Sequence, residues 1–431
     1  MKQTPVPKLG RRQLLTKSAG ALAATGLVAW TAKAAAQVAV IPAGVAPGSM
    51  ATSSVSAAPA TPALPATAAK PLPAYIAWKD PAAMIVHSTN TVETRRHAFG
   101  TSVVTPNETV YIRNNLPPPS FDIVADRDSW QTSVEGVKNP RKFTVGELKS
   151  LGLETVAMVL QCSGNGRGMF PVRPSGTPWQ VGAAACVIWS GVPVRLLADT
   201  LGGVTNGMVY MTGTGGEKTP DGLDPKSVMV ERSVPIAAMA DALLAWEMNG
   251  VPISLAHGGP LRLIVPGYNG VNNVKYLARL AFTQAQSDAA IQQTGYRLSP
   301  PGEKGDPSQP SIWEMAPKSW INSPGPESGP LRAGKVQIKG VGFGGMQAVK
   351  AIEVSADSGK SWKPARLVGP DLGKYAWRQF VFSIDLAAGA HTLMCRTIDS
   401  LGVVQAENRI ENTGGYSNSS WRDHAVKVVV I

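Results

Sequence analysis

Short apolar runs, separated by glycine and proline, dominate the chain from about residue 74 to residue 317. Three of these runs, 155–160, 208–211 and 261–265, are bounded by turn-forming residues, a pattern that predicts buried strands. Residues 235–247 carry apolar side chains at helical spacing, so we expect a helix there. The mixture predicts an α+β domain over residues 74–320.

The pattern changes after residue 326, where apolar and polar residues begin to alternate. The alternation is clearest at 336–338, 352–354 and 426–430, and Asp357-Ser358-Gly359 is typical of a tight hairpin turn. Short strands with regular turns over about a hundred residues predict an immunoglobulin-like sandwich at 330–431, although the Cys–Trp–Cys pattern of antibody domains is missing. We expect this all-β domain to be structural rather than catalytic.

The N-terminal 36 residues have the features of an export signal. Arg11-Arg12 precedes an uncharged run at 18–30, and small residues at 32–36 offer cleavage sites. Paired arginines in this context resemble a twin-arginine signal, which directs folded proteins to the periplasm. An ordinary secretory signal or a retained anchor is the alternative, but the run is too short to span ~30 Å of hydrocarbon comfortably. We expect an export signal at 1–36, an Ala/Pro-rich flexible tether at 37–73, and no integral membrane protein after processing.

Composition and charge narrow the class of protein. Hydrophobic residues make up 44% of the chain and there are eleven Trp residues, as in globular proteins. The net charge of +12 falls to +6 without residues 1–36, because that segment holds six of the 41 Lys and Arg residues and none of the 29 acids. A modest positive balance suits anionic substrates or acidic partners, and the sequence lacks the dense basic run of a nucleic-acid arm.

The three cysteines, Cys162, Cys186 and Cys395, are odd in number and far apart, which argues against a disulfide framework. Neither they nor the five His residues show the close spacing of a zinc site. Any metal must therefore be held mainly by something other than side chains. Cys186 and Cys395 lie within apolar runs, and we interpret both as buried, inert thiols.

Cys162 has a different setting, in the segment Gln161-Cys162-Ser163-Gly164-Asn165-Gly166-Arg167-Gly168 directly after the predicted strand 155–160. Small residues on both sides let a bulky group approach the backbone. Arg167 would lower the pKa of the thiol and favour the thiolate that binds metals. The alternative is another buried, inert cysteine.

The Cys162 loop and four further segments resemble the sulfite oxidase family of molybdenum enzymes, in particular its bacterial periplasmic, cytochrome c-linked sulfite dehydrogenases. The five segments occur in the family's order and spacing at 110–117, 161–168, 246–250, 257–267 and 273–277. The C-terminal sandwich is similar to the family's dimerisation domain. The resemblance therefore implies a molybdopterin-binding α+β domain followed by an immunoglobulin-like domain.

The resemblance also implies a molybdenum centre with one molybdopterin per metal and no haem in this chain. Cys162 would be the protein ligand to the metal, because soft thiolates suit such a centre. Arg262 and Lys275 offer a planar fork and a point charge for an anionic pterin phosphate. The residues that match cofactor-binding positions are Tyr111, Ile112, Arg113, Asn114, Asn115, Cys162, Asp224, His257, Arg262, Asn273, Val274 and Lys275.

For catalysis, the resemblance implies that Arg113 holds the substrate oxyanion and that the hydroxyl of Tyr296 bonds the reacting oxygen. Arg422 would add a second cation from the C-terminal segment. The implied reaction converts sulfite and water to sulfate with release of two electrons. The sequence contains no Cys-x-x-Cys-His haem motif, so we expect a c-type cytochrome as acceptor, as a separate protein or a dedicated subunit, and a homodimer through the C-terminal domain.

Two departures from the family pattern leave the substrate open. Asn115 stands where many relatives carry His, and Gln180 stands where animal relatives carry an Arg that contacts sulfite. Fewer cations weaken the binding of a dianion, so a sulfane or thiosulfate-pathway dehydrogenase is an alternative. An exported molybdenum-dependent sulfoxide reductase is a further one, although those relatives lack the C-terminal sandwich. A non-catalytic scaffold is disfavoured because Cys162 is present.

Overall fold

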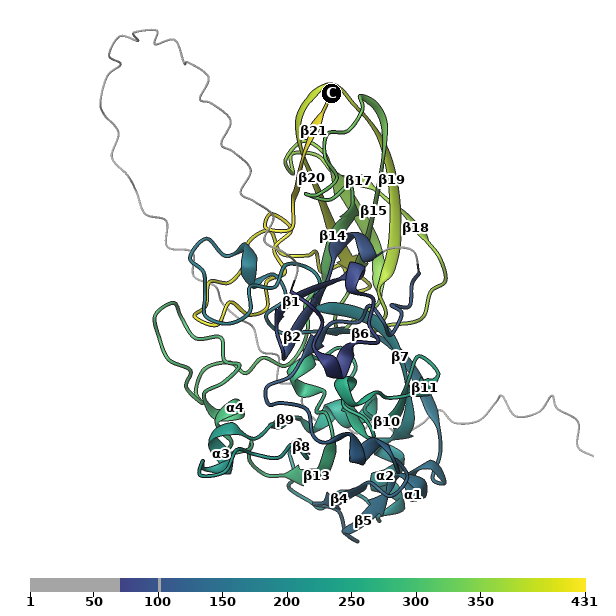
Figure 1. The fold of residues 1–431 in the computed structure, drawn as a ribbon, viewed down its shortest axis with the longest axis vertical. Helices are drawn as coiled ribbons and strands as arrows, with labels where there is room; N and C mark the ends of the chain where they lie inside the picture. The colour runs from purple at the N-terminus through teal and green to yellow at the C-terminus, as the bar shows by residue number, and fades with distance from the viewer. Residues whose placement is uncertain (1–69, 100–101) are drawn as a thin grey trace, which may run out of the picture. The chain divides into compact units, whose positions relative to one another are not determined.

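Five β-sheets form the framework of the computed structural model, which describes residues 70–99 and 102–431 (Figure 1). The predicted export signal and nearly all of the predicted tether lie outside the described residues. Within the described part of the chain, no helix is long and apolar enough to cross a membrane.

The sheet that carries the Cys162 loop runs in the order β11-β10-β7-β6, with β12 paired to β10. Strand β7 is buried along almost its whole length, because its apolar run packs on both faces. The predicted strands 155–160 and 261–265 are confirmed as β6 and β12. The strands span Glu154–Gln161 (β6), Ala184–Pro193 (β7), Leu243–Met248 (β10), Val251–Pro252 (β11) and Arg262–Ile264 (β12).

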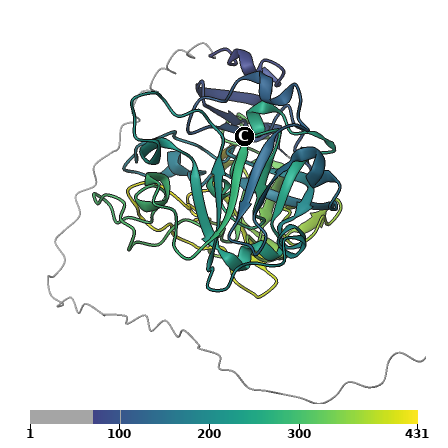
Figure 2. The same ribbon diagram turned by 90° about the horizontal axis from the view of Figure 1, so that it is seen from below.

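A second five-stranded sheet, in the order β5-β4-β13-β8-β9, packs against the first through a shared hydrophobic core. Val192, Leu244 and Leu263 meet Met211 and Leu280 in that core. Figure 2 gives the arrangement from below, with strands of the α+β domain crossing the middle of the view. The strands are Gln131–Glu135 (β4), Arg141–Thr144 (β5), Tyr210–Gly215 (β8), Glu231–Pro235 (β9) and Leu277–Thr283 (β13), and a small third sheet contains Met84–Ser88 (β1), Thr91–Thr94 (β2) and Ile112–Arg113 (β3).

The helices of the α+β domain are short. Helix α1 begins at a capping box in which the Thr144 hydroxyl accepts from the Glu147 N–H and the Glu147 carboxylate accepts from the Thr144 N–H. The α-helices span Val145–Lys149 (α1), Val194–Thr200 (α2), Pro225–Val228 (α3) and Ala290–Gln293 (α4). The 3-10 helices span Ala74–Ile76, Pro81–Ala83, Arg96–Ala98, Phe121–Val124, Arg167–Met169, Ile236–Ala240, Leu255–His257 and Gly270–Asn272.

Two expectations about local structure are corrected. The predicted helix at 235–247 is wrong: a 3-10 turn at Ile236–Ala240 is followed by strand β10. Residues 242–245 are all buried, and pairing of β10 with β7 and β12 overrides the helical spacing of its apolar side chains. The strand predicted at 208–211 begins only at Tyr210.

The C-terminal part is a sandwich of two four-stranded sheets, in the orders β14-β15-β19-β18 and β17-β16-β20-β21. The alternation predicted at 426–430 is confirmed, because Val426, Val428 and Val430 are buried and their neighbours are exposed. Positive φ values of 62° at Ser358 and 85° at Gly359 turn the chain between β16 and β17, as their sequence indicates. The strands are Lys318–Ser323 (β14), Gly334–Phe343 (β15), Val349–Ser355 (β16), Lys363–Pro364 (β17), Arg366–Val368 (β18), Arg378–Leu386 (β19), Gly389–Asp399 (β20) and Val426–Val430 (β21).

The sandwich contacts the Cys162 loop of the α+β domain through several hydrogen bonds. The long connection between β20 and β21, residues 400–425, supplies Ser417, whose N–H donates to the carbonyl of Ser163 at 2.8 Å. Strand β14 supplies Lys318, whose Nζ donates to the carbonyl of Asn165 at 3.1 Å. Sandwich residues therefore hold the segment that carries the thiol. The predicted fold class, an α+β domain followed by a β-sandwich, is confirmed.

Candidate active site

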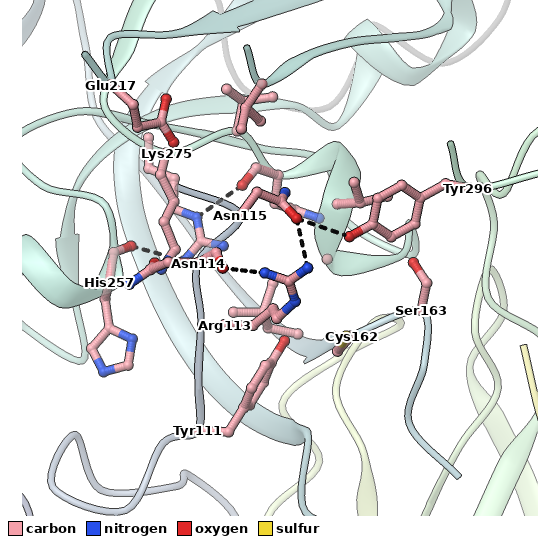
Figure 3. A pocket seen from close by; sticks show the side chains of 17 residues that line it. Tyr111, Arg113, Asn114, Asn115, Cys162, Ser163, Glu217, His257, Lys275 and Tyr296 are labelled. Atoms are coloured by element: carbon pink, nitrogen blue, oxygen red, sulfur yellow. Dashed lines mark hydrogen bonds between the residues drawn. The ribbon is translucent and has the colours of Figure 1, made fainter. Parts of the chain in front are cut away.

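A cavity with about 640 Å³ of space, its mouth included, lies where β6 ends (Figure 3). The residues that line it come from segments far apart in the sequence: Tyr111, Arg113, Asn114, Asn115, Leu160, Cys162, Ser163, Glu217, Val230, His257, Arg262, Gly270, Val271, Asn273, Val274, Lys275 and Tyr296.

Cys162 is held in the cavity wall by backbone bonds at the end of β6. Its N–H donates to the carbonyl of Ala183 at 2.9 Å, and its carbonyl accepts from the N–H of Asn165 at 2.9 Å, so the chain turns directly after the thiol. The Asn165 side chain locks this turn by donating to Oε1 of Gln161 at 3.0 Å and accepting from the Ala183 N–H at 3.2 Å. The thiol is thus presented to the cavity on a rigid support.

The other two thiols lie elsewhere. Cys186 and Cys395 are buried in strands β7 and β20, and burial raises the pKa of each to about 12. Thiols with such a high pKa remain protonated and unreactive, in agreement with their interpretation as inert.

Arg167 makes contacts of its own within the fold, and its expected effect on the thiol of Cys162 stays a prediction. Its guanidinium donates to the carbonyls of Gly414 at 2.8 Å and Thr177 at 3.1 Å, and it lies 5.1 Å from the ring centre of Tyr416. The charge of Cys162 acts on Lys318 and Arg113. Burial lowers the pKa of Lys318 to about 7, although the charge of Cys162 acts in the opposite direction. In Arg113, by contrast, the charges of Tyr296 and Cys162 outweigh the effect of burial and raise the pKa.

Arg113 and Tyr296 meet at the side chain of Asn115. Oδ1 of Asn115 accepts from Nη2 of Arg113 at 2.6 Å and from the hydroxyl of Tyr296 at 3.3 Å. Figure 3 shows this group beside Cys162, and Arg113 donates a further bond to the carbonyl of Asn114. Tyr296 has a φ of +51°, which is unusual for a large side chain. The predicted substrate-binding pair is therefore brought together.

A cluster of buried cations lines another part of the cavity. Nζ of Lys275 donates to Oδ1 of Asn114 at 2.5 Å, and Arg262 donates to the carbonyls of His257 at 2.9 Å and Asn273 at 3.1 Å. Behind them, Nζ of the buried Lys79 lies 3.1 Å from Nε2 of His257. These cations are bonded mainly to neutral acceptors.

Burial destabilises the charged forms of this cluster. Burial is the largest cause that lowers the pKa of Lys79 to about 7 and the pKa of Arg262 to about 10. Burial is also the largest cause that lowers the pKa of Lys275 and the pKa of His257 far below their usual ranges. Repulsion between neighbouring cations lowers the pKa of Lys275 and His257 further. An anionic occupant would relieve both effects.

Glu217 was not found from the sequence. Among the described residues it is the only carboxylate lining the cavity, burial raises its pKa to about 7, and its buried Oε2 has no hydrogen-bond partner. It follows the glycine pair Gly215-Gly216 at the end of β8, a setting that carries no recognisable motif.

Three of the predicted site residues and Gln180 do not line the cavity. Ile112 packs in a hydrophobic cluster, and Asp224 caps α3 by accepting from the N–H of Lys226 at 3.0 Å. Arg422 donates to Glu407 at 2.6 Å, so the expected second cation is not in the cavity. The predicted residues that do line it are Tyr111, Arg113, Asn114, Asn115, Cys162, His257, Arg262, Asn273, Val274, Lys275 and Tyr296.

The cavity fits an anionic pterin that bears a metal. It combines a thiol, a cluster of basic side chains and two buried polar atoms that have no hydrogen-bond partner among the described residues, Oγ of Ser163 and Oε2 of Glu217. Gly270 also lets the backbone approach closely, because a Cβ there would lie 2.9 Å from the carbonyl oxygen of Gln161. Fold and site together define a molybdopterin-binding oxidoreductase.

Comparison with known families agrees with this class. Residues 117–291 match the oxidoreductase molybdopterin binding domain and residues 309–430 match the Mo-co oxidoreductase dimerisation domain. Sulfite oxidase of Gallus gallus is 31% identical over 335 residues, which cover 74% of this chain and 72% of that protein. Sulfite oxidase of Arabidopsis thaliana is 31% identical over 359 residues, which cover 76% and 89%. The chain belongs to the sulfite oxidase family of molybdenum-cofactor oxidoreductases.

A solved structure shares the fold. The sulfane dehydrogenase SoxCD from Paracoccus pantotrophus superposes with a TM-score of 0.67 at 24% identity, covering 80% of this chain and 89% of that chain. The predicted family and the predicted order of its two domains are confirmed. The roles of individual site residues, the predicted domain limits and the periplasmic location stay predictions.

Proposed function

We propose that this protein oxidises sulfite to sulfate and passes the electrons to a c-type cytochrome. One sulfite and one water give one sulfate, two protons and two electrons. The observation that carries the proposal is the meeting of Arg113 and Tyr296 at Asn115, in the same cavity as Cys162. The relatives at 31% identity that are named sulfite oxidases support it.

Each part of the cavity has a role in this proposal. Cys162 holds the metal, and Arg262, Lys275 and His257 hold the anionic pterin. When bound, the molybdenum–pterin group supplies the oxygen transfer and the two-electron redox chemistry.

The substrate end of the cavity orients the anion. Arg113 binds an oxygen of sulfite through its charged N–H groups, and Tyr296 donates to the oxygen at which charge changes during the reaction. Asn115 fixes both donors, because its Oδ1 accepts a hydrogen bond from each.

Location and partners complete the proposal. The paired arginines at residues 11 and 12 support export to the periplasm by the twin-arginine route, where c-type cytochromes are available. The match to a dimerisation domain supports a homodimer through the sandwich.

The first experiment measures molybdenum per chain in the purified mature protein and then sulfite-dependent reduction of cytochrome c in the same sample. We expect about one molybdenum per chain and turnover with sulfite. Molybdenum without turnover would reject sulfite as substrate. A fully matured preparation without molybdenum would overturn the proposal.

Oxidation of sulfane sulfur is the second candidate. Asn115 and Gln180 in place of basic residues leave fewer cations for a dianion, which favours a less highly charged sulfur group. The fold shared with a sulfane dehydrogenase is compatible with it. Turnover with thiosulfate or persulfide substrates, but not with sulfite, would select this candidate. The sandwich argues against a sulfoxide reductase.

A further inference from the structure

Tyr416 is a sandwich-domain residue that stacks on Tyr296, a residue of the cavity wall. It lies in the connection between β20 and β21, which contacts the α+β domain on both sides of it. Before it, the Thr413 hydroxyl donates to the carbonyl of Pro300 at 2.7 Å. After it, the Ser417 N–H donates to the carbonyl of Ser163, the residue next to Cys162.

One buried side chain, that of Asn412, hydrogen-bonds both the N–H and the carbonyl of Tyr416. Oδ1 of Asn412 accepts from the Tyr416 N–H at 2.9 Å, and Nδ2 of Asn412 donates to the Tyr416 carbonyl at 3.0 Å. Asn412 is only 4% exposed. Ser417 follows with a φ of +55°, a conformation that costs free energy and persists where the surroundings enforce it. The position of Tyr416 is therefore fixed before any ligand binds.

The ring of Tyr416 forms a wall with Tyr296. The two rings are stacked with centres 5.1 Å apart and planes at 22°, and the guanidinium of Arg167 lies 5.1 Å from the ring centre of Tyr416. Tyr296 lines the cavity on one side and a surface groove on the other, and Tyr416 lines the same groove. The pair thus stands where the groove meets the cavity.

The hydroxyl of Tyr416 has capacity for a ligand. It makes no hydrogen bond within the described part of the chain, unlike the hydroxyl of Tyr296. Burial raises the pKa of Tyr416 to about 12, so the hydroxyl is a donor at neutral pH. The charges of Arg113 and Cys162 also act on this group, which places it within electrostatic reach of the proposed reaction site.

We infer that Tyr416 is a substrate-contacting residue, whose hydroxyl donates a hydrogen bond to an oxygen of the bound sulfur oxyanion at the junction of groove and cavity. This inference rests on the proposed function and extends it. A hydrogen bond from a fixed neutral donor to an anion is stronger than one between neutral groups, so the contact adds to affinity.

The test compares the unaltered holoenzyme with Tyr416→Phe, which keeps the stacked ring and loses only the hydroxyl. The matched control is Tyr210→Phe, a half-buried tyrosine whose ring packs near Trp313 away from the cavity. The dissociation constant of sulfate is measured by calorimetry on the oxidised protein, without turnover. We expect it to rise about tenfold or more in Tyr416→Phe, with no change in the control.

The same variants are assayed with sulfite. We expect KM to rise about tenfold while kcat falls less than about threefold, because the lost bond acts on binding. An unchanged sulfate dissociation constant in Tyr416→Phe, or no sulfate binding to the unaltered protein, would overturn the inference. Absence of sulfite turnover in the unaltered protein would reject the proposed function alone, since sulfate binding is read independently.

Discussion

The hydroxyl of Tyr296 donates a hydrogen bond of 3.3 Å to Oδ1 of Asn115, although 181 positions separate the two residues. The same oxygen accepts from Arg113 at 2.6 Å. An amide oxygen only accepts, so Asn115 orients two donors toward one place. Asn115 is therefore a positioning residue for the proposed substrate end.

Asn115→Ala removes this common acceptor. We expect kcat/KM for sulfite to fall about 10- to 100-fold, because Arg113 and Tyr296 lose their shared orientation. Steady-state kinetics on molybdenum-normalised protein checks this. The control is Asn139→Ala, whose side chain donates to the carbonyl of Leu201 at an exposed position and should leave the rate unchanged. An equal loss in both variants would contradict the assignment.

Cys162→Ser should abolish sulfite turnover while the fold persists. The thiol lines the cavity and is not part of a strand, so we expect the free energy of unfolding to change by less than about 1 kcal/mol. Chemical unfolding and turnover are measured together. Cys395→Ala is the comparison variant. Its free energy of unfolding should fall by about 1–2 kcal/mol, because Cys395 packs in the sandwich core, and its kcat should be unchanged. A catalytically active serine variant would refute Cys162 as the metal ligand.

Lys275→Met should reduce the molybdenum content of the purified protein about fivefold or more. Lys275 is a buried cation in the cavity, and its removal weakens the attraction for an anionic pterin. Asp224→Ala should keep full molybdenum content, because Asp224 only caps the short helix α3. Metal analysis of both variants measures these molybdenum contents. A loss of molybdenum confined to Asp224→Ala would contradict both the cofactor-binding role of Lys275 and the purely structural role of Asp224.

Glu217→Gln should change how stability depends on pH. Burial raises the pKa of Glu217 in the folded state to about 7, above its usual 4.5, so the folded protein binds the proton more tightly than the unfolded chain does. The stabilisation that protonated Glu217 gives the folded state is fully present below pH 4.5 and is lost as the pH rises through about 7. Relative to the glutamine variant, the free energy of unfolding of the unaltered protein should fall by on the order of 1–3 kcal/mol between pH 5 and pH 8.

Thermal unfolding of both proteins across that range provides the measurement. A constant difference between the two melting temperatures would show that Glu217 does not titrate in this window. A difference of opposite sign would mean that the carboxylate is stabilised as an anion by Lys275 and not destabilised by burial.

The sequence alone determined the family and the larger architecture. Strands such as β6 and β12 follow from apolar runs bounded by turn residues, and the alternation of Val426, Val428 and Val430 follows from one buried face. Most predicted cofactor-binding residues lie within contiguous segments, and those segments converge on one cavity.

Only the tertiary structure decided what no local pattern encodes. Residues 243–248 form strand β10 because β7 and β12 offer hydrogen bonds on both sides, which a helical spacing does not reveal. Arg422 pairs with Glu407 outside the cavity, whereas Glu217 lines the cavity and Lys318 and Tyr416 contact its Cys162 loop from separate elements. Their roles depend on distances across the folded chain, and burial, not residue type, sets the pKa of Glu217 and Lys318.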